Sequence, residues 1–211
     1  MGAQSQIPLE PRKTPVQARS TVTVEAIYEA TFQVLLAVGA DRLTTTRVAE
    51  RAGVSVGTLY QYFPNKQSLL LSVLEKHHDR VISAVELACR RNHGQQLSTM
   101  IESVVEAFVD AKTERSDISM ALYATAVGVQ ERALLNKAGK RARAAMASML
   151  ATAPNTKFDD LPFTSLMLIS AMGGATRAVL EAGATPKMVR SLRMQLVLLC
   201  RGFLMSAAGQ A

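Results

Sequence analysis

Residues 44–66, TTTRVAERAGVSVGTLYQYFPNK, constrain the fold of this chain more than any other segment. Threonine side chains that can cap a helix precede a short amphipathic run, and Gly53 stands where a tight turn needs a residue that tolerates positive φ. Ser55 can then cap a second short run. The segment therefore predicts two short helices, 46–52 and 56–62, joined by a turn at Gly53.

Most of the remaining chain carries apolar residues at the spacing of an α-helix. Strand-type alternation and internal repeats do not stand out, so we expect an all-α chain of about nine helices and no sheet. Gly39 suits a left-handed cap at the end of the first helix, and Pro186 suits the first turn of the last. The other helices are expected at 22–38, 65–91, 97–111, 117–127, 130–150, 163–182 and 186–207, with a loop at 154–162.

The second short helix has the properties of a recognition helix that enters the major groove of DNA. Leu59 and Phe63 are spaced to pack inward, whereas Val56 can contact a thymine methyl group and Gln61 can pair with an adenine edge. A generic helical hairpin shares part of this pattern, but here cap, glycine, serine, aromatic pair, proline and lysine follow in order. Residues expected to contact DNA are Thr45, Val56, Gly57, Thr58, Tyr60, Gln61, Tyr62 and Lys66.

The overall charge is compatible with a polyanionic partner but does not single out this motif. The net charge is +7 and the pI is about 9.7. Residues 1–80 hold nine Lys/Arg and seven Asp/Glu, whereas residues 81–211 hold fifteen and ten, so the larger surplus lies outside the motif.

The sequence argues against an enzyme, a cofactor and a membrane protein. His77, His78 and His93 do not form a metal set, and no paired carboxylates, Ser/His/Asp order or phosphate-binding glycine loop appear. Cys89 and Cys200 lie in apolar helical patterns, so we expect small buried side chains that suit a reducing cytoplasm. A secretory segment is not expected, nor an apolar run of 18 residues; the apolar stretch at 166–179 is interpreted as a buried helix.

The segment TTTRVAERAGVSVGTLYQYFPNKQSL resembles the DNA-binding signature of TetR-type bacterial transcriptional regulators, and the similarity extends from Val22 to about Leu74. This resemblance implies a homodimer, a three-helix N-terminal domain and a C-terminal domain that binds an inducer and forms the dimer. It also implies base contacts near Val56, Gly57 and Thr58. Phosphate contacts are implied around Thr45, Tyr60, Tyr62 and Lys66. The resemblance further implies DNA contacts from Thr46 and Arg47, which begin the preceding helix.

We expect three parts: a flexible basic arm at 1–20, a helix-turn-helix domain at 21–65, and a ligand-binding and dimerisation domain at 66–211 that begins with a long helix. The arm contains three prolines and few apolar residues. Two interpretations of it stay open: a tail without a role, and an arm that follows phosphates or the minor groove.

The last two helices are apolar around most of their circumference, so each needs neighbours on more than one side. One neighbour is the chain's own bundle and the other is expected to be a second subunit, which gives a four-helix isologous interface. Ordinary packing within one chain is the alternative. The predicted interface residues are Leu166, Ser170, Gly173, Gly174, Arg177, Met194, Val197 and Arg201.

All nine internal methionines lie at position 100 or later, and methionine fills irregular, adaptable space. A largely apolar small molecule is therefore an expected ligand, with plain core packing as the alternative for each single residue. The predicted pocket residues are Met100, Val104, Phe108, Met120, Tyr123, Met146 and Met149, with Tyr123 as the polar contact.

These observations favour a ligand-responsive repressor that binds a palindromic double-stranded DNA operator as a homodimer and is released by a small-molecule inducer. An enzyme on a helical bundle is disfavoured for the reasons above. A helical carrier, or a protein-interaction module without sequence-specific DNA binding, is the alternative.

Overall fold

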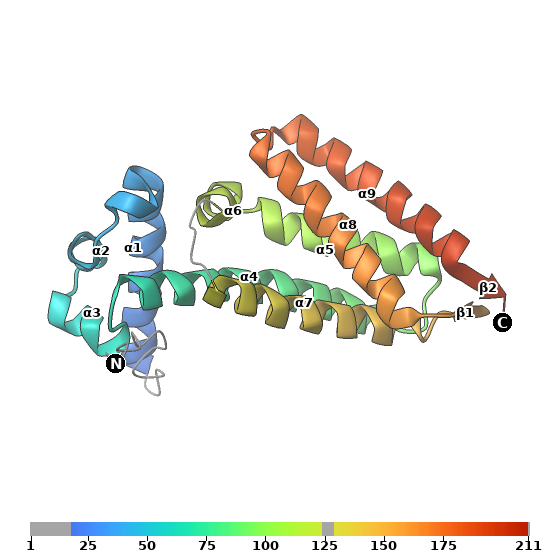
Figure 1. Cartoon of the computed structure of the whole chain (residues 1–211), viewed down its shortest axis with the longest axis horizontal. Helices are drawn as coiled ribbons and strands as arrows, with labels where there is room; N and C mark the ends of the chain where they lie inside the picture. The colour runs from blue at the N-terminus through green and yellow to red at the C-terminus, as the bar shows by residue number, and fades with distance from the viewer. Residues whose placement is uncertain (1–17, 124–128, 211) are drawn as a thin grey trace, which may run out of the picture. The chain divides into compact units, whose positions relative to one another are not determined.

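The computed structural model describes residues 18–123 and 129–210, with side chains at 20–121 and 132–209 (Figure 1). Nine helices and two short strands are found in these residues, which confirms the predicted all-α class. Most of the predicted arm at 1–20 and the end of the helix predicted at 117–127 lie outside them, and residues 18–20 already belong to the first helix.

The helix bounds agree closely with the periodicity of the sequence. Two helices, 56–62 and 186–207, begin and end where they were predicted. The bounds are α1 Ala18–Arg42, α2 Thr45–Ala52, α3 Val56–Tyr62, α4 Lys66–Arg91, α5 Leu97–Thr113, α6 Ser116–Tyr123, α7 Val129–Leu150, α8 Leu161–Glu181 and α9 Pro186–Ala207.

The described residues form two compact units, one from 18–77 with the described part of 121–132, and the other from 78–120 and 133–210. In the first unit, α1 packs on α2 and α2 on α3. The centre of the unit is apolar: Ile27, Leu43, Val48, Leu59 and Phe63 are all buried. They come from α1, α2 and α3 and from the residues that directly follow α1 and α3, so a small core holds the helix-turn-helix in place.

Gly39 interrupts α1 at the point where the sequence predicts its end. It has φ 79° and ψ 169°, a conformation that only glycine adopts readily, and one more helical turn follows as far as Arg42. The N–H of Leu43 then donates to the carbonyl of Gly39 (3.2 Å). The glycine therefore changes the direction of the chain before α2 begins.

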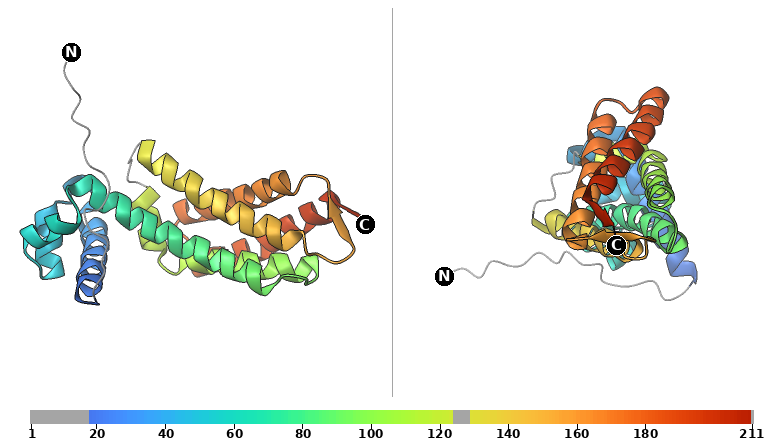
Figure 2. Two further views of the ribbon diagram at one scale, coloured as in Figure 1. Left: turned by 90° about the horizontal axis from the view of Figure 1, so that it is seen from below. Right: turned by 90° about the vertical axis from the view of Figure 1, so that its right-hand side faces the viewer.

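In the second unit, α8 and α9 lie side by side and antiparallel, and both pack on α5 (Figures 1 and 2). Arg141 on α7 donates to Glu86 on α4 (2.9 and 2.8 Å) and also pairs with Asp79, while Arg193 on α9 pairs with Asp110 on α5 (2.5 Å). The buried cluster at the centre includes Val81, Val85, Cys89, Met100, Ile101, Val104, Phe108, Met146, Met149, Leu168, Met172, Leu196, Cys200 and Leu204.

The expectation of no sheet is wrong. Strand β1 (Thr156–Phe158) pairs antiparallel with β2 (Ala208–Gln210), so that Thr156 lies opposite Gln210 and Phe158 opposite Ala208. Each strand is only three residues long, too short for apolar alternation to be visible, and its partner is about fifty residues away in the sequence.

Two described segments, Ser20–Arg42 and Leu161–Glu181, are long and apolar enough by length and composition to cross a membrane. The sequence contains no uninterrupted apolar run of 18 residues, as expected, but the average hydropathy of these two segments is high enough to pass the test. Core helices of water-soluble proteins pass the same test. In α8 the inner stripe, including Leu168, Met172 and Leu180, is buried, whereas the outer face is exposed.

Candidate DNA-binding interface

The turn between α2 and α3 has the geometry that its sequence predicts. Thr44 caps α2 by accepting a hydrogen bond from the N–H of Arg47 (3.3 Å). Gly53 ends α2 in the left-handed conformation (φ 68°, ψ 30°), and the N–H of Val54 returns to the carbonyl of Ala49 (3.0 Å). The two helices are therefore joined by a rigid turn.

Helix α3 is closed at both ends by specific contacts. The hydroxyl of Ser55 accepts from the N–H of Thr58 (2.9 Å), as expected of an N-cap, and it also lies 2.8 Å from the hydroxyl of Thr58. At the other end, Phe63 adopts an extended conformation and its N–H donates to the carbonyl of Leu59 (2.9 Å). Leu59 and Phe63 are buried as predicted.

The outward face of α3 carries the residues predicted to read bases. Gly57 and Gln61 are exposed, and Val56 and Thr58 are half-buried. A Cβ built on Gly57 meets only the hydroxyl of Ser55, at an ordinary 3.7 Å, so the chain itself does not require glycine there. This face presents a methyl group, an amide and a hydroxyl without a charged side chain, a combination suited to base edges rather than phosphates.

The residues predicted to bind phosphate surround this face and are held by neighbouring groups. The hydroxyls of Thr45 on α2 and Tyr60 on α3 lie 3.1 Å apart. Arg47 is exposed and donates to the carbonyl of Arg42 (3.0 Å), and Lys66 at the start of α4 donates to the carbonyl of Asp41 (3.3 Å). A lysine ammonium has three donors, so Lys66 keeps donors for a phosphate oxygen.

The two remaining residues of the predicted set differ in exposure. Thr46, in the first turn of α2, is exposed, whereas Tyr62, at the end of α3, is half-buried with its ring centroid 6.5 Å from that of Phe63.

Two contacts were not anticipated from the sequence. The Thr45–Tyr60 pair joins residues fifteen positions apart, and Arg51 on α2 donates to the side chain of Gln33 on α1 (2.5 Å). Arg51 is exposed on α2, and its partner on another helix gives no local signal in the sequence. The first contact holds α3 against α2 within the helix-turn-helix, and the second ties α2 to α1.

The predicted ligand-pocket residues come together only in part. Met100, Val104, Phe108, Met146 and Met149 are buried in one cluster in the second unit, whereas Met120 is half-buried outside it. The side chain of Tyr123 lies outside the described residues. Two pockets, of about 560 and 340 Å³, are lined by none of the seven; one lies between α4 and α5 and the other between the start of α5 and the end of α9.

Several buried polar groups accompany this cluster. Lys112 continues the inner stripe of α5 after Phe108, and burial lowers the pKa of its ammonium to about 8. Sequence reasoning missed it, although its spacing from Phe108 was visible. Ser165 and Thr176 on α8 are buried, and their hydroxyls have no hydrogen-bond partner among the described residues.

The two cysteine thiols behave as predicted. Cys89 and Cys200 are buried and not joined in a disulfide. Burial raises the pKa of Cys89 to about 12 and that of Cys200 to about 11, which keeps both as neutral thiols. Within the residues that the structure describes, His, Cys, Asp and Glu side chains do not gather into a metal-binding group.

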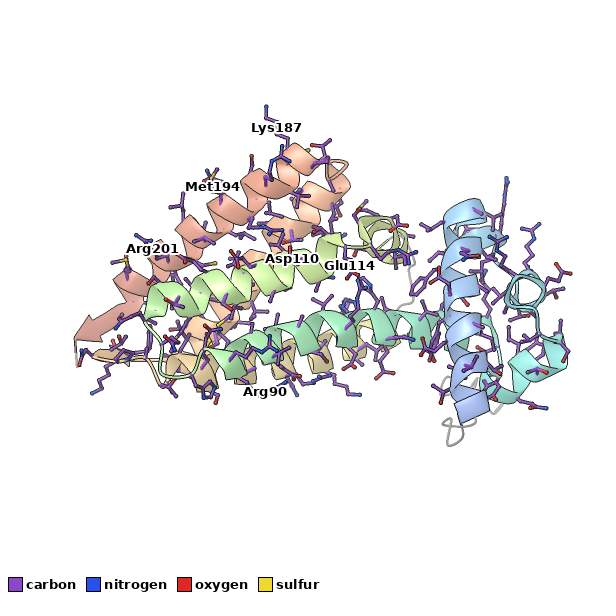
Figure 3. All side chains as sticks on the ribbon, turned by 180° about the vertical axis from the view of Figure 1, so that it is seen from behind. Arg90, Asp110, Glu114, Lys187, Met194 and Arg201 are labelled. Atoms are coloured by element: carbon purple, nitrogen blue, oxygen red, sulfur yellow. The ribbon has the colours of Figure 1, made fainter. Side chains whose placement is uncertain are left out.

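The predicted interface residues lie on a face of α8 and α9 that the chain itself leaves uncovered. Leu166, Ser170, Gly174, Arg177, Met194 and Arg201 are exposed, and Gly173 and Val197 are half-buried. Figure 3 shows Lys187, Met194 and Arg201 following one another along α9 and pointing away from the bundle. Further apolar side chains share this exposure, namely Phe163, Met167, Leu198, Leu199 and Met205.

Comparison with known proteins matches both halves of the chain. The family model described as "Bacterial regulatory proteins, tetR family" matches residues 27–73, and the one described as "Tetracyclin repressor-like, C-terminal domain" matches residues 96–204. The HTH-type transcriptional repressor KstR of Rhodococcus jostii is 35% identical over 81 residues, which are 38% of this chain and 38% of KstR. Relatives described as repressors and as an activator both match in this way.

Solved structures share the fold over most of the chain. A Mesorhizobium loti protein assigned to the TetR family has a TM-score of 0.77 at 18% identity, over 92% of this chain and 100% of that one. The transcriptional regulator FadR of Bacillus subtilis, solved with stearoyl-CoA, has a TM-score of 0.68 at 16% identity, over 83% and 96%.

The capped turn, the short exposed α3 and the helical bundle define a helix-turn-helix protein of the regulatory class. With a match over residues 27–73 and over more than half of the chain at 96–204, this chain belongs to the TetR family of bacterial transcriptional regulators. Proteins of this family are DNA-binding regulators and not enzymes.

Proposed function

We propose that this protein is a cytoplasmic, ligand-responsive repressor that binds a palindromic operator as a homodimer and leaves it when a small, largely apolar molecule binds. The observation that carries the proposal is the rigid presentation of α3: its base-reading face is open while Leu59 and Phe63 anchor its other side. Two such helices related by a two-fold axis fit successive major grooves when they are about 34 Å apart.

The uncovered face of α8 and α9 supports the homodimer. Met194 is 62% exposed and Met205 67% exposed, a state that is unfavourable for a contiguous apolar face in water. A Cβ built on Gly173 or Gly174 meets nothing within 4 Å, so neither glycine is needed for packing within the chain. Each glycine costs a helix about 1 kcal/mol relative to alanine, which favours a role in close approach of a second subunit.

The apolar core of the second unit supports a ligand site. Met100, Met146 and Met149 line it with flexible side chains that can repack around a guest. The unpartnered hydroxyls of Ser165 and Thr176 suit a site that another molecule completes, because buried polar groups normally have hydrogen-bond partners. The same fold accommodates stearoyl-CoA in FadR, which favours an elongated apolar ligand.

The test begins with selection of DNA fragments from the source genome by the purified full-length protein. We expect enrichment of a palindromic sequence, bound by two protomers, with an affinity that falls steeply as salt rises. Equal binding to fragments of any sequence at moderate salt would contradict the proposal. Transcription from a promoter with the selected sequence should decrease when the protein is added; an increase would make the protein an activator.

Ligand response is tested on the same DNA. A panel of apolar molecules of graded length, including long-chain acyl-CoA esters, is added to the protein–DNA complex. We expect at least one member to lower DNA affinity by about five- to 150-fold, the usual range of coupling between two sites. A bound molecule that leaves DNA affinity unchanged would count against release by an inducer.

A further inference from the structure

A continuous set of contacts links α4 to the end of the recognition helix through α1. The ammonium of Lys76 on α4 lies 4.6 Å from the ring centroid of Tyr28 on α1 and forms an ion pair with Glu25, one turn earlier on α1. The ring of Tyr28 in turn lies 5.7 Å from the ring of Phe63, inclined at 54°. All four residues belong to the first compact unit.

Phe63 connects this series of contacts to α3. It is the C-cap of α3, its N–H donates to the carbonyl of Leu59, and its side chain is 1% exposed. Its neighbour Tyr62, at 6.5 Å between ring centroids, belongs to the predicted DNA-contacting set. A shift of Phe63 therefore moves the end of the recognition helix, because packed aromatic rings in a core do not deform continuously.

The contact between Lys76 and Tyr28 has the chemistry of a stable clamp. A lysine ammonium is attracted to the negative face of an aromatic ring, and the carboxylate of Glu25 holds the ammonium in place. Burial, followed by the charges of Glu25 and Glu75, raises the pKa of Tyr28, so its ring stays a neutral phenol at ordinary pH. The clamp is present in the protein alone and needs no DNA.

We propose that Lys76 and Tyr28 are positioning residues for DNA recognition: their contact fixes α1 against α4 and, through Phe63, sets where the end of α3 stands. This inference rests on the proposed DNA-binding function. Lys76 acts through Tyr28 and does not touch the operator. Loss of the clamp populates protomers with a displaced α3, and the affinity of each protomer for its half of the operator is multiplied by the fraction of protomers that keep the competent position.

The experiment measures operator affinity by fluorescence anisotropy, with the full-length protein and the selected operator. Lys76→Met removes the charge, and Tyr28→Leu removes the ring. A partly exposed cation–π contact accounts for roughly a two- to fivefold effect per protomer, so a dimer that loses two is expected to bind about four- to twenty-five-fold more weakly. Lys76→Arg and Tyr28→Phe retain a cation over a ring and should stay within about twofold of the parent.

Three controls separate positioning from other roles. Lys140→Met, on the exposed face of α7, removes the same charge elsewhere and should leave affinity unchanged. The slope of log affinity against log salt should be the same for Lys76→Met and the parent, because no phosphate contact is lost. The double variant should bind less weakly than the product of the two single effects predicts, because both substitutions remove the shared contact between Lys76 and Tyr28.

The outcomes distinguish this inference from the proposed function. If the parent selects no operator, the DNA-binding proposal fails. If the parent binds its operator and a folded, dimeric Lys76→Met variant binds equally well, the positioning inference is overturned. A salt slope lower by about two for the dimer would show instead that Lys76 contacts phosphate directly. Circular dichroism checks that each variant is folded, and sedimentation checks that it is dimeric. If Lys76→Met does not fold, the same test is made with Tyr28→Leu, which should fold and bind the operator more weakly than the parent.

Discussion

The guanidinium of Arg141 on α7 donates two hydrogen bonds to the carboxylate of Glu86 on α4, at 2.9 and 2.8 Å. The same guanidinium also pairs with Asp79, two helical turns before Glu86 on α4. This bidentate arrangement joins α4 and α7 with charged groups, in addition to the apolar cluster to which both helices contribute. Lysine at position 141 could not make both hydrogen bonds to one carboxylate in this geometry.

The Arg141–Glu86 pair is expected to make stability depend on pH. The hydrogen bond from Arg141 lowers the pKa of Glu86 below its ordinary 4.5, so the stabilisation is complete above that value and is lost as the pH falls through the folded-state pKa. Because the side chain of Arg141 is 38% exposed, we expect Glu86→Gln to cost only about 1 kcal/mol at pH 7. Urea unfolding at pH 7 and pH 3 measures this.

The difference in the free energy of unfolding between the parent and Glu86→Gln should shrink towards zero at pH 3. Arg91→Met, exposed at the end of α4, is the matched control and should change stability little at either pH. Protein concentration is held constant, because association contributes to apparent stability. A difference that grows on acidification would contradict the assignment.

Substitution of Lys66 should change the salt dependence of DNA binding, in contrast to Lys76. Lys66→Met removes a cation at the start of α4 that we propose to contact phosphate. The slope of log affinity against log salt is expected to decrease by about one per protomer, and affinity should fall by a similar factor on specific and non-specific DNA. Titrations at three or more salt concentrations provide the measurement. An unchanged slope would mean that Lys66 does not contact phosphate and only donates its hydrogen bond to the end of α1.

An arginine at Gly174 should weaken the dimer. The position is exposed on α8, and a Cβ there meets no atom of its own chain within 4 Å, so Gly174→Arg can be accommodated within one protomer. A charged side chain at the centre of an apolar interface is expensive, so we expect half the parent mass in sedimentation at micromolar concentration. Ala144→Arg on the exposed face of α7 is the control. A Gly174→Arg protein of dimer mass would place the interface elsewhere.

The two thiols are expected to be unreactive in the folded protein. Because burial raises the pKa of Cys89 to about 12 and that of Cys200 to about 11, thiolate is scarce at pH 8 and reagents have no access. A colorimetric thiol assay should detect almost no thiol in the native protein and two in guanidinium chloride. Rapid labelling of either cysteine under native conditions would show that the core opens more readily than its packing indicates.

Local chemistry explains how far the sequence could predict this fold. Gly53, Ser55 and Phe63 determine the ends of α2 and α3 through contacts within five residues, so the motif and its caps were visible without coordinates. The buried stripes of α4 and α5 followed from periodicity for the same reason. The resemblance to the family that the sequence showed rested on this segment, which is also the part with the strongest local constraints.

Contacts between distant residues were beyond this reasoning. The pairing of β1 with β2, the Thr45–Tyr60 contact and the Lys76–Tyr28 contact each join residues that no sequence spacing relates. The buried methionines were expected to surround a ligand, but periodicity places a side chain on a face and does not distinguish a filled core from a cavity. The DNA contacts, the pocket and the interface residues remain predictions for the experiments above.

The ladder between β1 and β2 has a consequence for association. It joins residues 156–158 to 208–210 and so closes the chain around both α8 and α9. The two helices cannot splay apart at that end unless the ladder breaks. Their outer surface therefore keeps its form in a single protomer. In the dimer that we propose, this face would need little further ordering, so the entropic cost of association would be low.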